Sequence, residues 1–280
     1  NKDGAFQRTL RFRGPDLESA TEAELIGVSA RFNNIARRFG SGWALFFEAE
    51  RFAAAEYPDS VFPDAASWLV DRERRAGFEG ATHFESASHL TLYYMPPPDT
   101  VSWAERWLIE KERAERVRDW REDLGGFIAE TDRIADLLKG FMPELHPLDD
   151  EGTLTYLHRA ISSKRHRIVP PETPIYLDAM LVDEPLSGGL EPMLGPRHLR
   201  TITILGFPNL TRPGLLDALN HLALPYRWMT RFIALDKTQA TRELTKLRRQ
   251  WFAKRKSVTA LLREAMYNEP APLLDTDADN

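Results

Sequence analysis

The stretch HFESASHLTLYYMPP, residues 83–97, contains a strong signal for a β-strand. Leu90, Leu92 and Tyr94 recur at every second position, and the run stops at the prolines that begin with Pro96. A period of two places such side chains on one face of a sheet, and proline ends the pairing because it has no N–H to donate. A strand that ends before Pro96 is therefore predicted.

Upstream of this stretch the pattern indicates a strand, a helix and a strand. Residues 5–13 and 42–49 have the composition of strands. Between them Thr21 and Glu24 have the spacing of a capping box, and apolar residues then recur every three or four positions until Gly40. The chain therefore opens with two strands on either side of an amphipathic helix.

Downstream the pattern continues with helices and a short strand. Helices are predicted at residues 64–78, where Asp64 can be the cap, and at 103–121, 127–138 and 154–161, with an edge strand at 145–148. The order strand-helix-strand-strand-helix-strand is that of a ferredoxin-like fold. An α+β fold is therefore predicted for this half of the chain.

A second half begins after a segment rich in turn residues. Residues 163–196 contain six prolines and the pair Gly188-Gly189, which makes this segment the best boundary. Beyond it the predicted elements are a strand at 199–207, a helix capped by Thr211, a strand at 226–235 and a helix from Asp236 to about Tyr267. The prediction is α+β, with two sequential α/β-type subdomains at residues 1–168 and 169–268, mixed and largely antiparallel sheets, and a long amphipathic helix at the end.

Composition limits the kinds of protein and of site. The 280 residues carry a net charge of −5 with 42% hydrophobic residues, which is typical of a globular protein and argues against binding nucleic acid over the whole surface. There is no cysteine, so disulfides and cysteine-ligated metal sites are excluded. No apolar run approaches the roughly 18 residues that a bilayer crossing needs, so no transmembrane segment is predicted.

No catalytic, cofactor-binding or metal-binding residue is predicted. A P-loop has the pattern G-x-x-x-x-G-K-[ST], and none of the 16 glycines precedes a lysine. The seven histidines form no H-x-x-x-H or H-E-x-x-H pair, so a metal site would have to be assembled from distant segments. Strand alternation separates His83 and Glu85 from Ser86, which argues against a hydrolase triad there. The acidic runs at 149–151 and 183–184 are interpreted as helix-capping and loop residues.

Two groups of residues form the candidate interaction surface. Trp103, Trp107 and Trp120 lie in or beside a highly charged predicted helix, where tryptophan is typical of a surface that faces a partner. Lys254 and Arg255 lie at the edges of the apolar stripe of the last helix, where a charge must be paired or must extend to water. Their side chains either reach solvent or contact an acidic group from the neighbouring half or from another subunit.

The last helix also offers a basic face to a possible charged ligand. Its apolar stripe contains Leu244, Leu247 and Trp251, and Lys246 and Arg249 lie largely opposite. Binding of a single nucleic acid strand needs aromatic side chains interleaved with the charges. Because Trp251 belongs to the apolar stripe, nucleic acid is not favoured as a partner, and contact with a membrane surface stays an alternative.

Five segments together resemble one family of proteins, and they lie at residues 39–51, 83–97, 154–165, 224–237 and 235–258. Their order and spacing are similar to those of the N-terminal domain of TrbE-like conjugative transfer ATPases, in the CagE/TrbE/VirB family of type IV secretion ATPases. The resemblance covers nearly all of the chain. It implies a non-motor domain that docks to the membrane and to partners and helps to assemble an ATPase that energises pilus assembly or substrate transfer.

The resemblance also implies a location and a set of partners. The location is cytoplasmic, peripheral at the bacterial inner membrane, and the partners are inner-membrane type IV secretion components, the protein's own C-terminal ATPase domain and further copies in a homo-oligomer of the full-length protein. Residues 269–280 would be the linker toward that absent domain, where ATP and magnesium would bind, so that this chain itself holds no cofactor. The alternatives are a nucleic-acid-binding module of the conjugation apparatus and a hydrolase built on His83 and Glu85.

Overall fold

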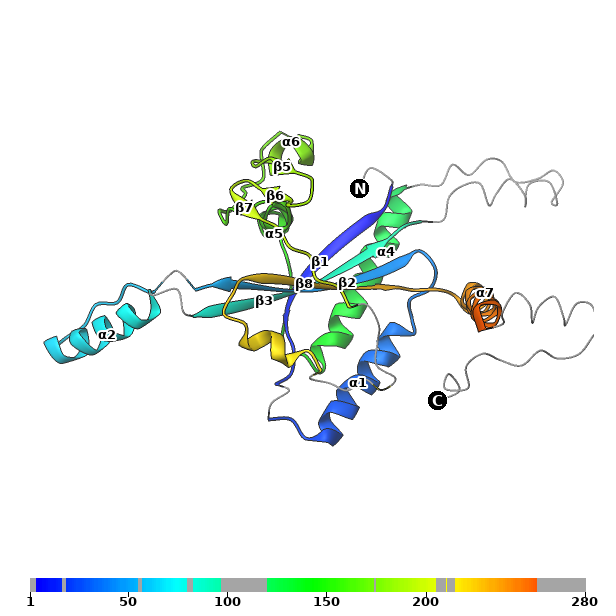
Figure 1. Ribbon diagram of the computed structural model, residues 1–280, viewed down its shortest axis with the longest axis horizontal. Helices are drawn as coiled ribbons and strands as arrows, with labels where there is room; N and C mark the ends of the chain where they lie inside the picture. The colour runs from blue at the N-terminus through cyan, green and yellow to red at the C-terminus, as the bar shows by residue number, and fades with distance from the viewer. Residues whose placement is uncertain are drawn as a thin grey trace, which may run out of the picture.

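The computed structural model describes residues 4–16, 19–54, 57–79, 83–96, 120–173, 175–204, 210 and 215–255. A five-stranded antiparallel sheet in the order β4-β1-β3-β2-β8 lies at its centre (Figure 1). The strands are β1 (Phe6–Arg13), β2 (Trp43–Ala53), β3 (Phe84–Tyr94), β4 (Glu144–Pro147) and β8 (Tyr226–Ile233). Helices pack against this sheet, and the predicted α+β fold class is confirmed.

The predicted strand around Leu90 occupies the middle of the sheet. β3 pairs with β1 on one side and with β2 on the other, so that Leu90 lies opposite Leu10 and Phe47. β4 pairs with the remaining edge of β1. The order along the chain is strand-helix-strand-strand-helix-strand, with α2 (Ala65–Phe78) inserted between β2 and β3, which is the split β-α-β arrangement.

One face of the sheet is apolar and is covered by α1 (Glu22–Ala36) and α4 (Trp120–Lys139). The capping box at the start of α1 is formed as predicted, because the Glu24 N–H donates to Thr21 Oγ1 at 3.3 Å and the Thr21 N–H donates to Glu24 Oε2 at 2.8 Å. The main hydrophobic core lies under these two helices, and its buried members are Leu10, Ile35, Phe39, Leu45, Leu90, Leu92, Ile134, Ala135, Leu138, Leu145 and Ala234.

The helix α4 corrects one predicted boundary. Residues 120–139 form a single helix, although a break was predicted between Arg121 and Phe127. Gly125 and Gly126 lie inside it, and a glycine in a helix costs only about 1 kcal/mol, which the burial of Phe127 and Ile134 offsets. The rest of the predicted helix at 103–121 lies outside the described residues.

The helix α5 (Asp150–Ile161) lies on the opposite side of the sheet from α1 and α4 (Figure 1). The Asp149 carboxylate caps it by accepting a hydrogen bond from the Gly152 N–H at 2.7 Å, which confirms the structural interpretation of that acidic run. Tyr156 is buried against the strands, where its hydroxyl donates to Glu48 Oε2 at 3.2 Å.

The helix α2 projects away from the sheet at the far ends of β2 and β3 (Figure 1). Asp64 caps it as predicted, since its carboxylate accepts from the Ser67 N–H at 2.8 Å. None of its residues is buried, and Trp68, Leu69 and Val70 are each at least half exposed. Contacts such as the hydrogen bond from Tyr57 Oη to Asp71 at 2.7 Å hold it to the chain beside it. We call residues 57–79 the α2 arm.

The later region of the chain returns to the same sheet. After α6 (Leu177–Leu181), the short strands β5 (Leu186–Ser187), β6 (Met193–Leu194) and β7 (Arg197–His198) form a small separate sheet, and η1 (Asp217–His221) precedes β8. β8 then pairs with β2 from Ala44↔Ile233 to Arg51↔Tyr226. A strand from the second predicted subdomain thus extends the sheet of the first, and the division at residue 168 stays a prediction.

The strand predicted at 199–207 is wrong over the residues that the structure describes. Residues 199–204 form no strand, and Ile202 is 92% exposed. β-branched side chains favour a strand only where a paired neighbour and a buried face are available. The cap predicted at Thr211 lies outside the described residues.

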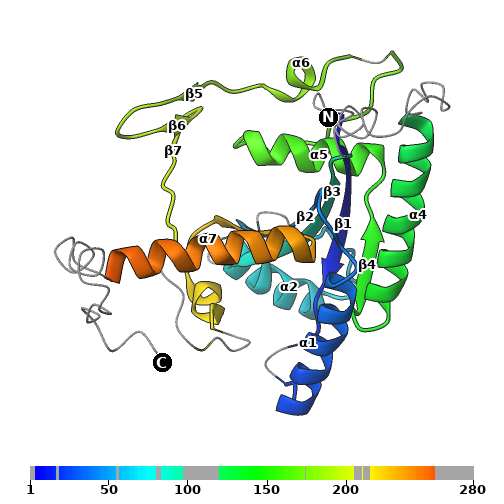
Figure 2. The ribbon, with the colours of Figure 1, turned by 90° about the vertical axis from the view of Figure 1, so that its right-hand side faces the viewer.

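The last described helix is α7 (Lys237–Arg255), which runs away from the end of β8 (Figure 2). It begins where predicted, because Asp236 Oδ1 accepts from the Gln239 N–H at 2.9 Å. No side chain among residues 237–250 is buried, and Leu244 and Leu247 are 66% and 52% exposed. The apolar stripe is thus uncovered in the described region of the molecule. Among the described helices, none has both the length and the apolar content that a bilayer crossing requires.

Candidate functional site

The sheet face under α5 is lined with polar side chains that are nearly all shielded from solvent. Because side chains alternate along a strand, the neighbours of the core leucines point to this face. Cross-strand register places Glu48 beside His89 and Thr9 beside Thr91, and the two threonine hydroxyls are 2.9 Å apart. We call the buried residues of this layer the polar face, and they are Thr9, Glu48, Glu50, His89 and Thr91.

Arginines from two distant segments balance the two buried carboxylates. Arg227 on β8 approaches both, with its Nε 3.2 Å from Glu48 Oε1 and its Nη2 3.5 Å from Glu50 Oε1. Arg165, from the loop after α5, donates to Glu50 Oε1 at 2.5 Å and lies over the Phe52 ring. Glu48 Oε1 is within ion-pair distance of Arg227 but has no hydrogen bond among the described residues. This carboxylate is therefore only partly compensated.

Burial sets the protonation of the polar face. It raises the pKa of Glu48, against the lowering effect of Arg227. It also lowers the pKa of His89 to about 4, so His89 is neutral at pH 7. The Tyr156 hydroxyl, which contacts Glu48, has its pKa raised by the same burial. The layer therefore keeps its charge on Glu48, Glu50 and the arginines, and no group in it is poised as a base near neutral pH.

A cleft of about 420 Å³ opens beside the polar face, between the sheet and α5. Its walls include Arg11, His89, Asp149 and Arg159, and Arg167 pairs with Glu151 across its lining at 2.6 Å. Burial, together with the nearby arginines, lowers the pKa of Arg159, whose Nε has no hydrogen bond among the described residues. Both signs of charge line the cleft, which suits a polar segment better than an apolar small molecule.

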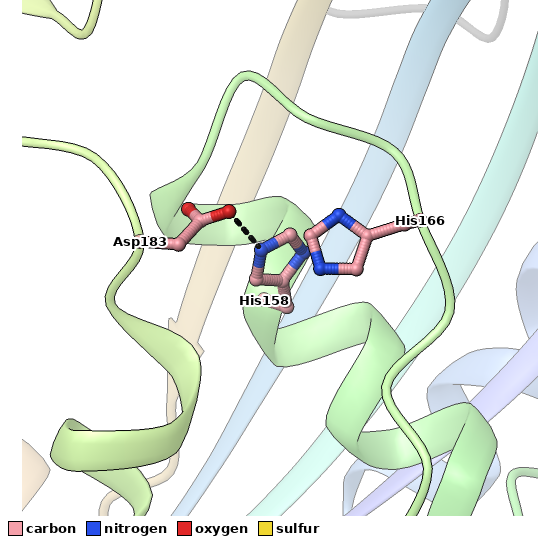
Figure 3. A group of neighbouring side chains, drawn as sticks. All are labelled: His158, His166 and Asp183. Atoms are coloured by element: carbon pink, nitrogen blue, oxygen red, sulfur yellow. Dashed lines mark ion pairs between the residues drawn. The ribbon is translucent and has the colours of Figure 1, made fainter.

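Three further side chains meet at the end of α5 away from its cap (Figure 3). His158 lies in the last turns of α5, His166 in the loop that follows, and Asp183 after α6. His158 Nε2 is 3.2 Å from Asp183 Oδ2, and the two imidazole rings have centroids 4.4 Å apart. We call these three residues the histidine cluster.

Hydrogen bonds hold the segment after α6 against the loop after α5. The Glu184 carboxylate accepts from the Ser163 N–H at 2.6 Å and from the Ser163 hydroxyl at 2.9 Å, and these bonds lower its pKa. A hydrogen bond from Ser162, followed by contacts with Lys164 and His158, lowers the pKa of Asp183. The pair Asp183-Glu184 therefore makes structural contacts, as the sequence interpretation expected.

The structure does not bring the predicted interaction surface together among the described residues. Trp120 is the first residue of α4 and is 57% exposed, with the Arg121 guanidinium 4.7 Å from its ring centre. Trp103 and Trp107 lie outside the described residues, and so do the side chains of Lys254 and Arg255. That surface stays a prediction.

Sequence reasoning missed the histidine cluster and the polar face. His83 stacks on Phe78 with ring centroids 4.4 Å apart, whereas His158, with no notable sequence spacing to another ligand, is the histidine that meets two further ligand types. The loop and α6 create that proximity, so no local pattern could have shown it. Buried charges such as Glu48 were detectable only as polar residues at strand positions.

Comparison with known proteins gives a consistent result. Residues 1–101 match the family model described as type IV secretion system ATPase VirB4/TrbE, N-terminal domain. "Conjugal transfer protein TrbE" of Rhizobium radiobacter is 32% identical over 267 residues, which are 89% of this chain and 32% of that protein. The chain therefore spans about a third of the length of this relative.

Two further relatives come from Sinorhizobium fredii (strain NBRC 101917 / NGR234), where a probable conjugal transfer protein TrbE is divided into two polypeptides. The first polypeptide is 41% identical over 99 residues, covering 34% of this chain and 66% of that protein. The second polypeptide is 37% identical over 98 residues, covering 35% of this chain and 15% of that protein.

Proposed function

We propose, from the premise that residues 1–101 belong to the N-terminal domain family of the VirB4/TrbE type IV secretion ATPases, that this chain is the non-motor docking and assembly domain of a conjugal transfer ATPase. The parent protein would energise pilus assembly or substrate transfer at the cytoplasmic face of the bacterial inner membrane. Its ATP and magnesium would bind in a separate C-terminal domain. Inner-membrane secretion components and further copies of the parent protein are the proposed partners.

The absence of a P-loop in the 280 residues supports the non-motor role. A phosphate-binding loop depends on backbone N–H groups that glycines leave accessible and on a lysine that meets the phosphate charge. No glycine here precedes a lysine. We infer that the chain alone does not turn over ATP, and that the reading frame after Asn280 encodes a P-loop. A frame without one would remove the proposed parentage.

The observation that carries the docking role is that two helices expose apolar side chains outside the core. In the α2 arm, Trp68 and Leu69 are 50% and 53% exposed, and in α7 the stripe of Leu244 and Leu247 is more than half exposed. Short isolated helices are marginal in water, and their stability comes from packing of the apolar face. Both helices would gain that packing from a partner.

We assign the α7 stripe to the ATPase portion of the parent protein. The matched relative is about three times as long as this chain, and α7 is the last element that the structure describes. The α2 arm extends from the opposite side of the sheet (Figure 1) and is assigned to inner-membrane components of the secretion channel.

Affinity purification tests the α2 assignment. The tagged chain is incubated with detergent-solubilised inner membranes from a host that carries the transfer system, and the captured channel proteins are identified by mass spectrometry. The chain should capture them, the double variant Trp68→Ala, Leu69→Ala should not, and Ile26→Ala in α1 should behave as wild type. Ile26 is a suitable control because it is 62% exposed on a helix that packs on the core. Equal capture by all three proteins would contradict the assignment.

Hydrogen exchange tests the α7 assignment. Amide protons of residues 241–250 should exchange quickly in the isolated chain and slowly in the full-length parent protein. The double variant Leu244→Asp, Leu247→Asp should restore fast exchange in the full-length protein, whereas Lys246→Ala should not. Fast exchange in the wild-type full-length protein would contradict the assignment.

The exposed basic side of α7 is the one feature that favours nucleic acid as an alternative partner. Arg242, Lys246 and Arg249 line a shallow groove along this helix. Binding there would be electrostatic and would weaken steeply as the salt concentration rises. A fluorescence titration with single-stranded DNA should show no tight complex at physiological salt if the docking role holds.

A further inference from the structure

The histidine cluster joins three chemical groups that are common metal ligands and that come from separate segments (Figure 3). His158, His166 and Asp183 each offer one ligand atom, and these atoms lie within 4.8 Å of one another. In Figure 3 the two imidazole rings and the carboxylate gather around His158. No other group of this kind is present among the described residues.

His158 is anomalous as a buried histidine. Its side chain is 0% exposed, and neither ring nitrogen has a hydrogen-bond partner within the described region of the chain. Nε2 is 3.2 Å from Asp183 Oδ2, but this contact does not have hydrogen-bond geometry. A buried polar group without a partner is costly, and in native proteins such a group usually binds water or an ion.

We propose that His158, His166 and Asp183 bind one divalent transition-metal ion of the Zn²⁺ class. Two imidazoles and one carboxylate form a donor set that suits zinc, with water at the remaining position. Two ligands of a tetrahedral zinc site are about 3.3 Å apart, since each lies about 2.0–2.1 Å from the metal. The exposed side chains of His166 and Asp183 have room to close from 4.8 Å, and the buried His158 provides the fixed ligand.

A lysine occupies some of the space that the metal would use. Lys164 Nζ is 3.1 Å from Asp183 Oδ2, so its ammonium is a competing cation. The Lys164 side chain is 52% exposed, and a surface ion pair of this kind is worth little. The metal can therefore displace it into water, while Glu184 keeps its hydrogen bonds to Ser163.

Metal binding would connect three segments that otherwise share few contacts. The ion would tie α5 to the loop after it and to the chain between α6 and the small sheet of β5, β6 and β7. Metal ligation across separate segments stabilises the folded state, because the unfolded chain has no preformed site. The inferred role is thus a structural clamp on the segment that leads from α5 to β8.

Zinc titration of the untagged chain tests this inference. After treatment with a chelator, the protein is titrated with ZnSO₄ by isothermal titration calorimetry, and bound metal is measured after gel filtration. One equivalent of zinc should bind and should raise the Tm. His166→Ala changes an exposed residue and should reduce the affinity at least tenfold, and Asp183→Asn should do the same.

The control is His146→Ala, which removes an exposed histidine on β4 outside the cluster. It should bind one equivalent as wild type does, and far-UV circular dichroism should show that all variants are folded. Absence of stoichiometric binding in the wild type, or equal affinity in His166→Ala and His146→Ala, would overturn the proposal.

Discussion

Adjacent residues on the same strands face two environments in this protein. Leu10 and Leu90 are fully buried under α1 and α4, whereas their neighbours Thr9 and His89 are buried on the polar face under α5. The apolar side gains stability from removal of hydrocarbon from water. On the polar side, each buried group needs its own partner, so stability there depends on specific pairs such as Glu48 with Arg227.

The apolar face should show the largest effect of substitution. Leu90→Ala removes a side chain of 0% exposure from the middle strand and should destabilise the protein by about 4 kcal/mol, because it leaves a cavity between the sheet and the helices. Urea denaturation followed by circular dichroism measures this loss. A loss below about 1 kcal/mol would mean that the apolar face does not carry the fold.

The polar face should show the next largest effect, through the loss of a charge partner. Arg227→Ala leaves Glu48, whose side chain is 1% exposed, without its cation and should cost about 3 kcal/mol at pH 7. Burial raises the pKa of Glu48, so this cost should shrink as the pH falls and the carboxyl takes up a proton. Arg231→Ala is the control, because Arg231 is exposed on the same strand. Equal losses in the two variants would count against the pairing.

The pH dependence of stability tests the polar face a second way. The unfolded chain protonates His89 near 6.5, whereas burial lowers the pKa of the folded protein's His89 to about 4. Stability from this group should therefore fall by roughly 2 kcal/mol as the pH decreases from about 6.5 to about 4. His89→Gln should lack this decrease.

Glu48 contributes with the opposite sign, because its raised pKa makes the folded state bind a proton more readily than the unfolded chain does. The difference between His89→Gln and wild type at each pH isolates His89. Parallel stability curves for the two proteins would contradict the assignment.

The exposed helices should show the smallest effect on stability. Leu69→Ala in the α2 arm is the same substitution as Leu90→Ala at a position that is 53% exposed, and it should change the free energy of unfolding by less than about 0.5 kcal/mol. A loss above 1 kcal/mol in urea denaturation would show that the α2 arm packs on the core in solution. The docking role would then need another surface.

Local signals made much of the fold predictable. The caps at Thr21, Asp64, Asp149 and Asp236 are formed, because each depends on residues three positions apart. The period of two around Leu90 identified the middle strand for the same reason. Features that depend on contacts between distant segments were not predictable in this way.

The missed features share that dependence on distant contacts. The pairing of β8 with β2 joins residues nearly 190 positions apart, as in Ala44↔Ile233. Conversely, Ile202 lies in a β-branched run that finds no partner strand among the described residues. The histidine cluster likewise forms only because the loop after α5 and the chain after α6 fold back onto His158.

ATP hydrolysis by the purified chain tests the central claim most directly. With ATP and magnesium in excess, phosphate release should not exceed that of a protein-free control, because the chain is proposed to dock and assemble a motor whose nucleotide site lies elsewhere. Phosphate release that rises in proportion to the chain's concentration and saturates with ATP would contradict the claim.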